Sequence, residues 1–143
     1  SISSMMGGML SQNLMETPLV GVDENGKTTY PRSNTFVGFS VLLNPEHKQT
    51  LALKMYDKVH TYTPQEISVM EMMLFRTLNG DGTGPMNIDS REDLETCMPS
   101  IAQDPMKFGA MMSILSRCCL NDNRNDMDEF YLEMCEMLNA LPA

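Results

Sequence analysis

The sequence predicts an α+β fold, with about four antiparallel β-strands in the N-terminal half followed by about four helices packed on the sheet. Three observations lead to this prediction: an Asn-Gly turn within residues 19–30, alternating apolar and polar residues at 50–62, and a helix-start signature at Thr63. The chain has 143 residues, a length that suits one domain. We therefore expect a single domain over residues 18–143, preceded by an arm at residues 1–17.

The expected arm is rich in Ser, Gly and Met. Its apolar residues are spaced to suit one face of a short helix, but Gly7 and Gly8 would weaken that helix by about 1 kcal/mol each. We expect an apolar arm that becomes ordered only on contact with another molecule, the alternative being a frayed terminus. The arm residues expected to bind a partner are Ile2, Met5, Met6, Met9 and Leu10.

Residues 18–62 are expected to be rich in β-structure, beginning with a hairpin. Asn25 and Gly26 both accept positive φ angles, so this pair is typical of a type I′ turn. Residues 19–23 and 28–30 flank the pair with apolar and β-branched side chains. The sequence therefore predicts two short antiparallel strands joined at this turn.

A second, longer hairpin is predicted over residues 35–62. Its strands, residues 35–43 and 50–62, each place alternate apolar residues on one face, on either side of a loop at 44–49. A period of two is typical of a half-buried antiparallel strand. The residues expected to face the core are Val37, Phe39, Val41, Leu43, Leu51, Leu53, Met55 and Val59.

The C-terminal part of the chain has helical periodicity. The segment 63–66, Thr-Pro-Gln-Glu, is a capping box with Pro at the first helical position, and it predicts a helix that ends at about Leu78. Ser90 and Asp104 are expected to cap two further helices. A fourth helix is expected over about 126–141, with an apolar stripe facing the core.

The first of these helices is apolar on two sides. The stripe expected to face the sheet consists of Ile67, Met70, Leu74 and Leu78. Val69, Met72 and Met73 lie roughly opposite, and a helix apolar on two sides is either centrally buried or shared with a partner. The chain contains 16 methionines, whose flexible thioethers can repack against a partner or simply fill a core. We expect Val69, Met72 and Met73 to bind a partner protein.

The net charge of −9 lies entirely in residues 63–143, because residues 1–62 carry equal numbers of acidic and basic side chains. Such a surface repels phosphate backbones, so we expect no direct binding of nucleic acid. An acidic helical face is expected at Asp128, Glu129, Glu133 and Glu136. This face is either simply solvated or complementary to a basic partner.

No motif predicts catalysis, a cofactor or a metal site. Cys118 and Cys119 would need a base such as His60, which is distant in sequence, and the four cysteines contain no CxxC pair. Two segments resemble calcium loops in part, residues 77–88 and 122–133. The first ends in Ile where a bidentate Glu is required, and the second has Arg and Met at its third and sixth positions.

We therefore expect a non-enzymatic structural subunit of a larger particle, of the virion type or similar, whose partners are copies of itself or other subunits. The alternative is a small acidic regulator or inhibitor that occupies a basic surface of another protein, such as a surface that binds nucleic acid. The first ten residues contain no Lys or Arg, and no apolar run is long enough to span a membrane. Without a secretory signal, the expected location is the cytoplasm or a particle assembled inside the cell.

Overall fold

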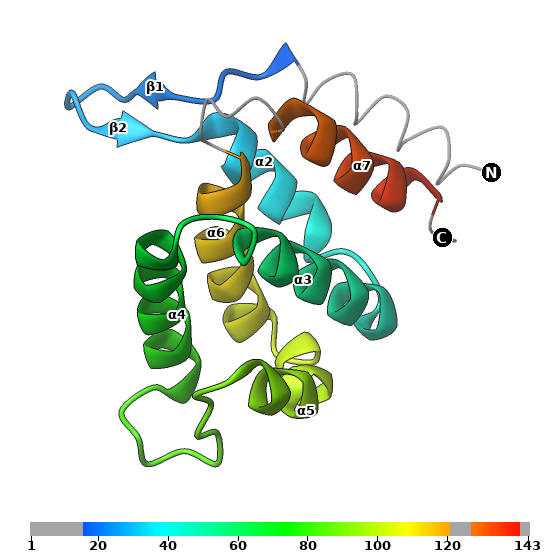
Figure 1. The fold of residues 1–143 in the computed structure, drawn as a ribbon. Coiled ribbons are helices and arrows are strands. Elements are labelled where there is room, and N and C mark those ends of the chain that lie inside the picture. The colour runs from blue at the N-terminus through cyan, green and yellow to red at the C-terminus, as the bar shows by residue number, and fades with distance from the viewer. Residues whose placement is uncertain (1–15, 121–126, 141–143) are drawn as a thin grey trace.

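The computed structural model describes residues 16–120 and 127–140, which form a two-stranded sheet and six helices (Figure 1). The strands are β1 (Gly21–Val22) and β2 (Thr28–Thr29). The helices are α2 (Pro31–Ser40), α3 (Pro45–Val59), α4 (Pro64–Asn79), α5 (Arg91–Ala102), α6 (Pro105–Leu120) and α7 (Met127–Ala140). The predicted α+β class with about four strands is therefore wrong, because the described residues are mainly helical.

The first predicted hairpin is present, but its turn differs from the prediction. Strands β1 and β2 pair antiparallel, with Gly21 opposite Thr29. The Gly26 N–H donates to the Asp23 carbonyl at 3.1 Å, and Gly26 has a φ of 77°. Asn25 does not have a positive φ, so the type I′ turn is not formed. The loop closes instead through one left-handed glycine, as in longer hairpin loops.

The second predicted hairpin, residues 35–62, is wrong, because this segment forms most of α2 and all of α3. Helix α3 begins at a local signal: the Asn44 side chain accepts a hydrogen bond from the His47 N–H at 2.9 Å, and Pro45 takes the first helical position. The buried residues of α3 recur at helical intervals and are Lys48, Leu51, Ala52, Met55, Tyr56 and Val59.

The apolar alternation in α3 fits two structures. Leu51, Met55 and Val59 are four residues apart, so they share one face of a strand and also one face of a helix. The neighbouring residues distinguish the two cases. Tyr56 is only 1% exposed although a strand would turn it to the opposite face, and Leu53 is only partly buried. The segment is therefore a helix whose apolar stripe includes every fourth residue.

The predicted starts of the later helices are confirmed. The Thr63 hydroxyl accepts the Glu66 N–H at 3.4 Å at the start of α4. The Ser90 hydroxyl accepts the Asp93 N–H at 3.1 Å at the start of α5. The Asp104 carboxylate accepts two N–H groups from the first turn of α6, at 3.1 and 3.2 Å. These caps satisfy backbone donors that would otherwise have no partner within the helix.

Helix α6 is the centre of the structure. It contacts α2, α3, α4, α5 and α7, and Figure 1 shows it between α4 on one side and α2 and α3 on the other. The fully buried residues that it contributes include Phe108, Met111, Met112, Leu115 and Cys119. The core stripe of α4 therefore packs on this helix and not on a sheet. No helix within the described ranges is long and apolar enough to cross a membrane.

Candidate functional site

One face of α4 is exposed although three of its residues are apolar. Val69, Met72 and Met73 are 48%, 55% and 45% exposed. Met70 and Leu74 belong to the other side of the helix and are buried in the core. The three residues predicted to bind a partner therefore lie together on one helix face, outside the core.

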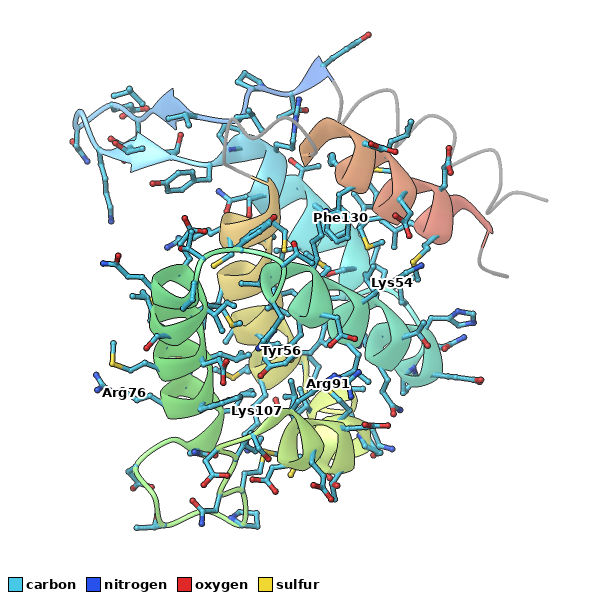
Figure 2. The ribbon with its side chains drawn as sticks, in the orientation of Figure 1. Lys54, Tyr56, Arg76, Arg91, Lys107 and Phe130 are labelled. Carbon is cyan, nitrogen blue, oxygen red and sulfur yellow. The ribbon has the colours of Figure 1, made fainter. Side chains whose placement is uncertain are left out.

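Two polar residues extend this face toward the ends of α4. Gln65, Val69, Met72 and Arg76 recur at intervals of four, three and four residues, a spacing that aligns side chains along one side of a helix. Gln65 and Arg76 are both exposed, and Figure 2 shows Arg76 extending away from the helical body. We refer to Gln65, Val69, Met72, Met73 and Arg76 as the α4 surface.

A hollow of about 340 Å³ opens beside the α4 surface. It lies where the C-terminal end of α3, the connection to α4 and the C-terminal part of α6 meet. Its lining consists of Val59, Tyr62, Gln65, Glu66, Val69, Met70, Met73 and Cys118. Glu66 is the one charged residue in this lining. The hollow therefore offers mainly apolar contacts to a side chain that enters it.

His60, the histidine considered as a base for the cysteines, is held by other groups. Its Nδ1 lies 2.8 Å from the Tyr56 carbonyl oxygen, and its Nε2 lies 3.0 Å from a carboxylate oxygen of Glu71. The Cys119 thiol donates to the Met55 carbonyl at 3.5 Å within the core, which fits a packing role. The described ranges contain no group of three His, Cys, Asp or Glu side chains placed to hold a metal ion.

The glycine-rich loop after α4, one of the two calcium-like segments, is organised by its own side chains. The Asp81 carboxylate accepts the Thr83 N–H at 3.0 Å and the Thr83 hydroxyl at 2.6 Å. These hydrogen bonds lower the pKa of the Asp81 carboxyl, because they favour its charged form. Asp81 thus forms a turn. The other segment, residues 122–133, begins outside the described residues.

The predicted acidic face lies on α7 and has a basic neighbour on α3. Glu129, Glu133 and Glu136 are exposed, whereas the side chain of Asp128 lies outside the described part of the chain. Lys54 Nζ is 2.9 Å from a carboxylate oxygen of Glu133, at the junction of α3 and α7 (Figure 2). This ion pair offsets part of the negative charge that a basic partner would recognise.

The other exposed large apolar residues are spread over four segments of the described chain. They are Val20 and Val22 at β1, Leu42 between α2 and α3, Met106 in the first turn of α6, and Leu132 on α7. Single exposed apolar side chains are normal on a folded protein, whereas a cluster marks an interaction site. The α4 surface is therefore the candidate functional site.

Residues 1–15 of the arm lie outside the described residues, and so do its predicted contacts Ile2, Met5, Met6, Met9 and Leu10. Of the two arm residues that are described, Thr17 accepts a hydrogen bond from Arg32 Nε at 3.3 Å through its carbonyl. The sequence interpretation also missed members of the α4 site. Gln65 and Arg76 could have been found from their spacing relative to Val69 and Met72. The place of Val59 and Tyr62 in the lining of the hollow could not be predicted, because residues 50–62 were expected to form a strand.

Comparisons with protein-family models, with curated proteins and with solved structures found no match. The assignment of the α4 surface and its adjacent hollow as the candidate site therefore rests on exposure, spacing and shape.

Proposed function

We propose that this protein is a non-enzymatic structural subunit of a larger multi-protein particle, of the virion type or similar. The observation that carries this proposal is the cluster of Val69, Met72 and Met73 on the exposed face of α4, beside a mainly apolar hollow. The exposed part of an apolar side chain adds nothing to the stability of the free domain, whereas a partner that covers it removes that apolar area from water. The α4 surface is accordingly the main contact with other subunits.

The free energy gained by covering the three apolar side chains is appropriate for a contact between subunits. Full burial of one Val or Met side chain contributes about 1.5–3 kcal/mol, so covering a side chain that is half exposed contributes about 1 kcal/mol. Three such side chains together contribute about 3 kcal/mol, which corresponds to a factor of roughly 100 in affinity. Methionine is also able to adapt its shape to the partner, because its side chain is unbranched and flexible.

The proposal includes a second contact, made by the arm at residues 1–17. Residues 1–15 contain no charged side chain, which is unusual in a chain with a net charge of −9. An uncharged apolar segment can be buried against a neighbouring subunit without desolvating a charge. The partners are copies of this chain or other subunits of the particle, with no direct contact to nucleic acid and a place of assembly inside the cell.

The proposal is tested by native mass spectrometry of the full chain, recovered from the cells that produce it. We expect the wild-type chain to carry partner subunits and the Met72→Glu variant to lose them, because the new charge would be buried without a partner. Met106→Glu is the matched control, because Met106 is an exposed methionine, at 85%, in the first turn of α6. Cys118, the residue of α6 that lines the hollow, lies near the opposite end of that helix. A wild-type chain found alone, or complexes retained by Met72→Glu, would contradict the proposal.

A further inference from the structure

We propose that the α4 surface binds the α4 surface of a second copy of this chain, with the two helices antiparallel and related by a two-fold axis. This inference rests on the proposed function, because it names the partner of the same surface. Two observations support it: the spacing of the exposed residues is symmetric along the helix, and the charged residues near the two ends of the helix, Glu66 and Arg76, are opposite in sign.

The spacing reads the same in both directions. Gln65, Val69, Met72 and Arg76 are separated by four, three and four residues, so reversing the helix reproduces the pattern. When an identical helix crosses this face antiparallel about its midpoint, Val69 lies opposite Met72 of the second copy, and Met72 lies opposite Val69 of that copy. The same contact then occurs twice, as an interface between identical copies with two-fold symmetry requires. Spacings of three and four residues are those of helices packed side by side.

The charges at the ends of the surface select the antiparallel direction. Arg76 lies near the C-terminal end of α4, and Glu66 lies in the first turn beside Gln65. The Arg76 guanidinium is exposed and makes no ion pair within the described ranges, and it extends away from the body in Figure 2. An antiparallel second copy places its Glu66 near this guanidinium. A parallel copy would place like charges side by side, which is unfavourable.

The α4 surface is also a place where two copies of an acidic chain can approach. The net charge of −9 opposes self-association over most of the surface. Helix α4 itself carries one basic residue, Arg76, and two acidic residues, Glu66 and Glu71, the latter with a carboxylate oxygen 3.0 Å from His60 Nε2. The net charge of this helix is therefore −1, so repulsion between two copies is weaker here than a chain with a net charge of −9 would otherwise impose.

One pair of helices covers less area than a standard protein interface, which buries about 800 Å² on each partner. We therefore expect a weak dimer with a dissociation constant on the order of micromolar. Such a contact suits an assembly in which each copy makes several weak contacts, because linked contacts strengthen one another.

Sedimentation equilibrium of the purified full chain over a range of concentrations tests the inference. We expect the average mass to rise from that of one chain, 16.1 kDa, toward twice that value. Met72→Glu should weaken the dimer by more than about 100-fold, because each dimer would bury two unpaired carboxylates. Met106→Glu should leave the dimer unchanged. Circular dichroism melting checks that each variant is folded.

Charge reversal tests the predicted register. Glu66→Arg gives a surface with two positive ends and Arg76→Glu gives one with two negative ends, so each variant alone should dimerise about tenfold more weakly. An equal mixture of these two variants should recover the mixed dimer, because every end then meets its opposite. The variant that carries both changes should dimerise like the wild type, since it again has one end of each charge.

Three results would overturn the inference. They are a chain that stays monomeric throughout, a dimer that Met72→Glu does not weaken, and single charge variants that dimerise as strongly as the wild type. The proposed function survives if only the inference fails. A purified chain that is monomeric, but whose native complexes are lost in Met72→Glu, shows that the α4 surface binds a different subunit.

Discussion

The hydroxyl of Ser33 on α2 is hydrogen-bonded to the hydroxyl of Ser116 on α6, inside the core. Both residues are almost completely buried, and they are 83 positions apart in the chain. The Ser116 hydroxyl also donates to the Ser113 carbonyl at 3.3 Å. For Ser33, the bond to Ser116 is the one side-chain hydrogen bond among the described residues. The pair therefore links α2 to the central helix α6 by a buried hydrogen bond.

We expect Ser116→Ala to lower the free energy of unfolding by about 1–3 kcal/mol, because it leaves the buried Ser33 hydroxyl without a partner. The double variant Ser33→Ala with Ser116→Ala should lose less than the sum of the two single changes, since neither polar group is then left unpaired. Urea denaturation measures all three variants, with the exposed Ser68→Ala as the control. Strictly additive losses would contradict the pairing of the two hydroxyls.

Two buried phenols make the stability of the fold sensitive to alkaline pH. Tyr56 and Tyr131 are each 1% exposed. Burial raises the pKa of both phenols above the ordinary value of about 10, with smaller contributions from Glu71 at Tyr56 and from Cys135 at Tyr131. Because the folded pKa is above the unfolded one, this stabilisation is complete below about pH 10 and is lost as the pH rises further.

We therefore expect the two phenols to ionise together with the loss of helix during an alkaline titration. The absorbance of phenolate and the circular dichroism of the helices, recorded on the same samples, measure the two events. Tyr56→Phe should move the midpoint of alkaline unfolding to higher pH. The change removes a phenol that keeps its proton in the folded state and releases it on unfolding at high pH. Ionisation of all four tyrosines before any loss of helix would contradict this prediction.

The parts of the fold that could be predicted from the sequence are those determined locally. The caps at Thr63, Ser90 and Asp104 depend on a side chain and on N–H groups two or three residues away, so the sequence contains the whole interaction. Asn44 makes the same kind of cap at the start of α3. The sequence therefore contains the signal for the start of α3 as well, but the apolar alternation over 50–62 favours a strand and conflicts with it.

The outcome for α3 was decided by packing between distant segments. Burial of Tyr56 depends on neighbours such as Phe75 on α4, whose ring centroid is 6.4 Å from that of Tyr56. Lys48 is likewise 7% exposed, with its ammonium 5.2 Å from the centroid of the Phe108 ring. The periodicity of the sequence alone favours an exposed position for a lysine such as Lys48. Its contact with Phe108, 60 positions away, depends on the packing of α3 against α6.

The candidate site divides in the same way. Val69, Met72 and Met73 could be placed on one side of a helix by spacing alone, since the helix itself was predicted correctly. The hollow beside them could not be predicted, because Val59 and Cys118 come together only when α3 and α6 pack against α4. A single helix pattern thus predicts a surface, whereas a cavity requires the arrangement of several helices.

The acidic face of α7 should not be required for assembly. We expect the double change Glu129→Lys with Glu136→Lys to leave native complexes intact, because both side chains are exposed on a helix other than α4. Native mass spectrometry at low and at physiological salt measures this, since exposed charge attraction is screened over about 8 Å at 0.15 M. Complexes that depend on these two carboxylates, and that dissociate as salt rises, would favour the acidic regulator.

The two sides of α4 should respond oppositely to substitution. Leu74 is completely buried, so Leu74→Ala should lower the free energy of unfolding by about 2–5 kcal/mol through lost burial and the cavity left behind. Met72 is 55% exposed, so the charge introduced by Met72→Glu stays in water in the free chain and should change stability by less than about 0.5 kcal/mol. Urea denaturation of the monomer at low concentration separates these folding effects from association. If Met72→Glu unfolded the monomer, α4 would be buried on both sides, and the observation that supports the assembly function would be lost.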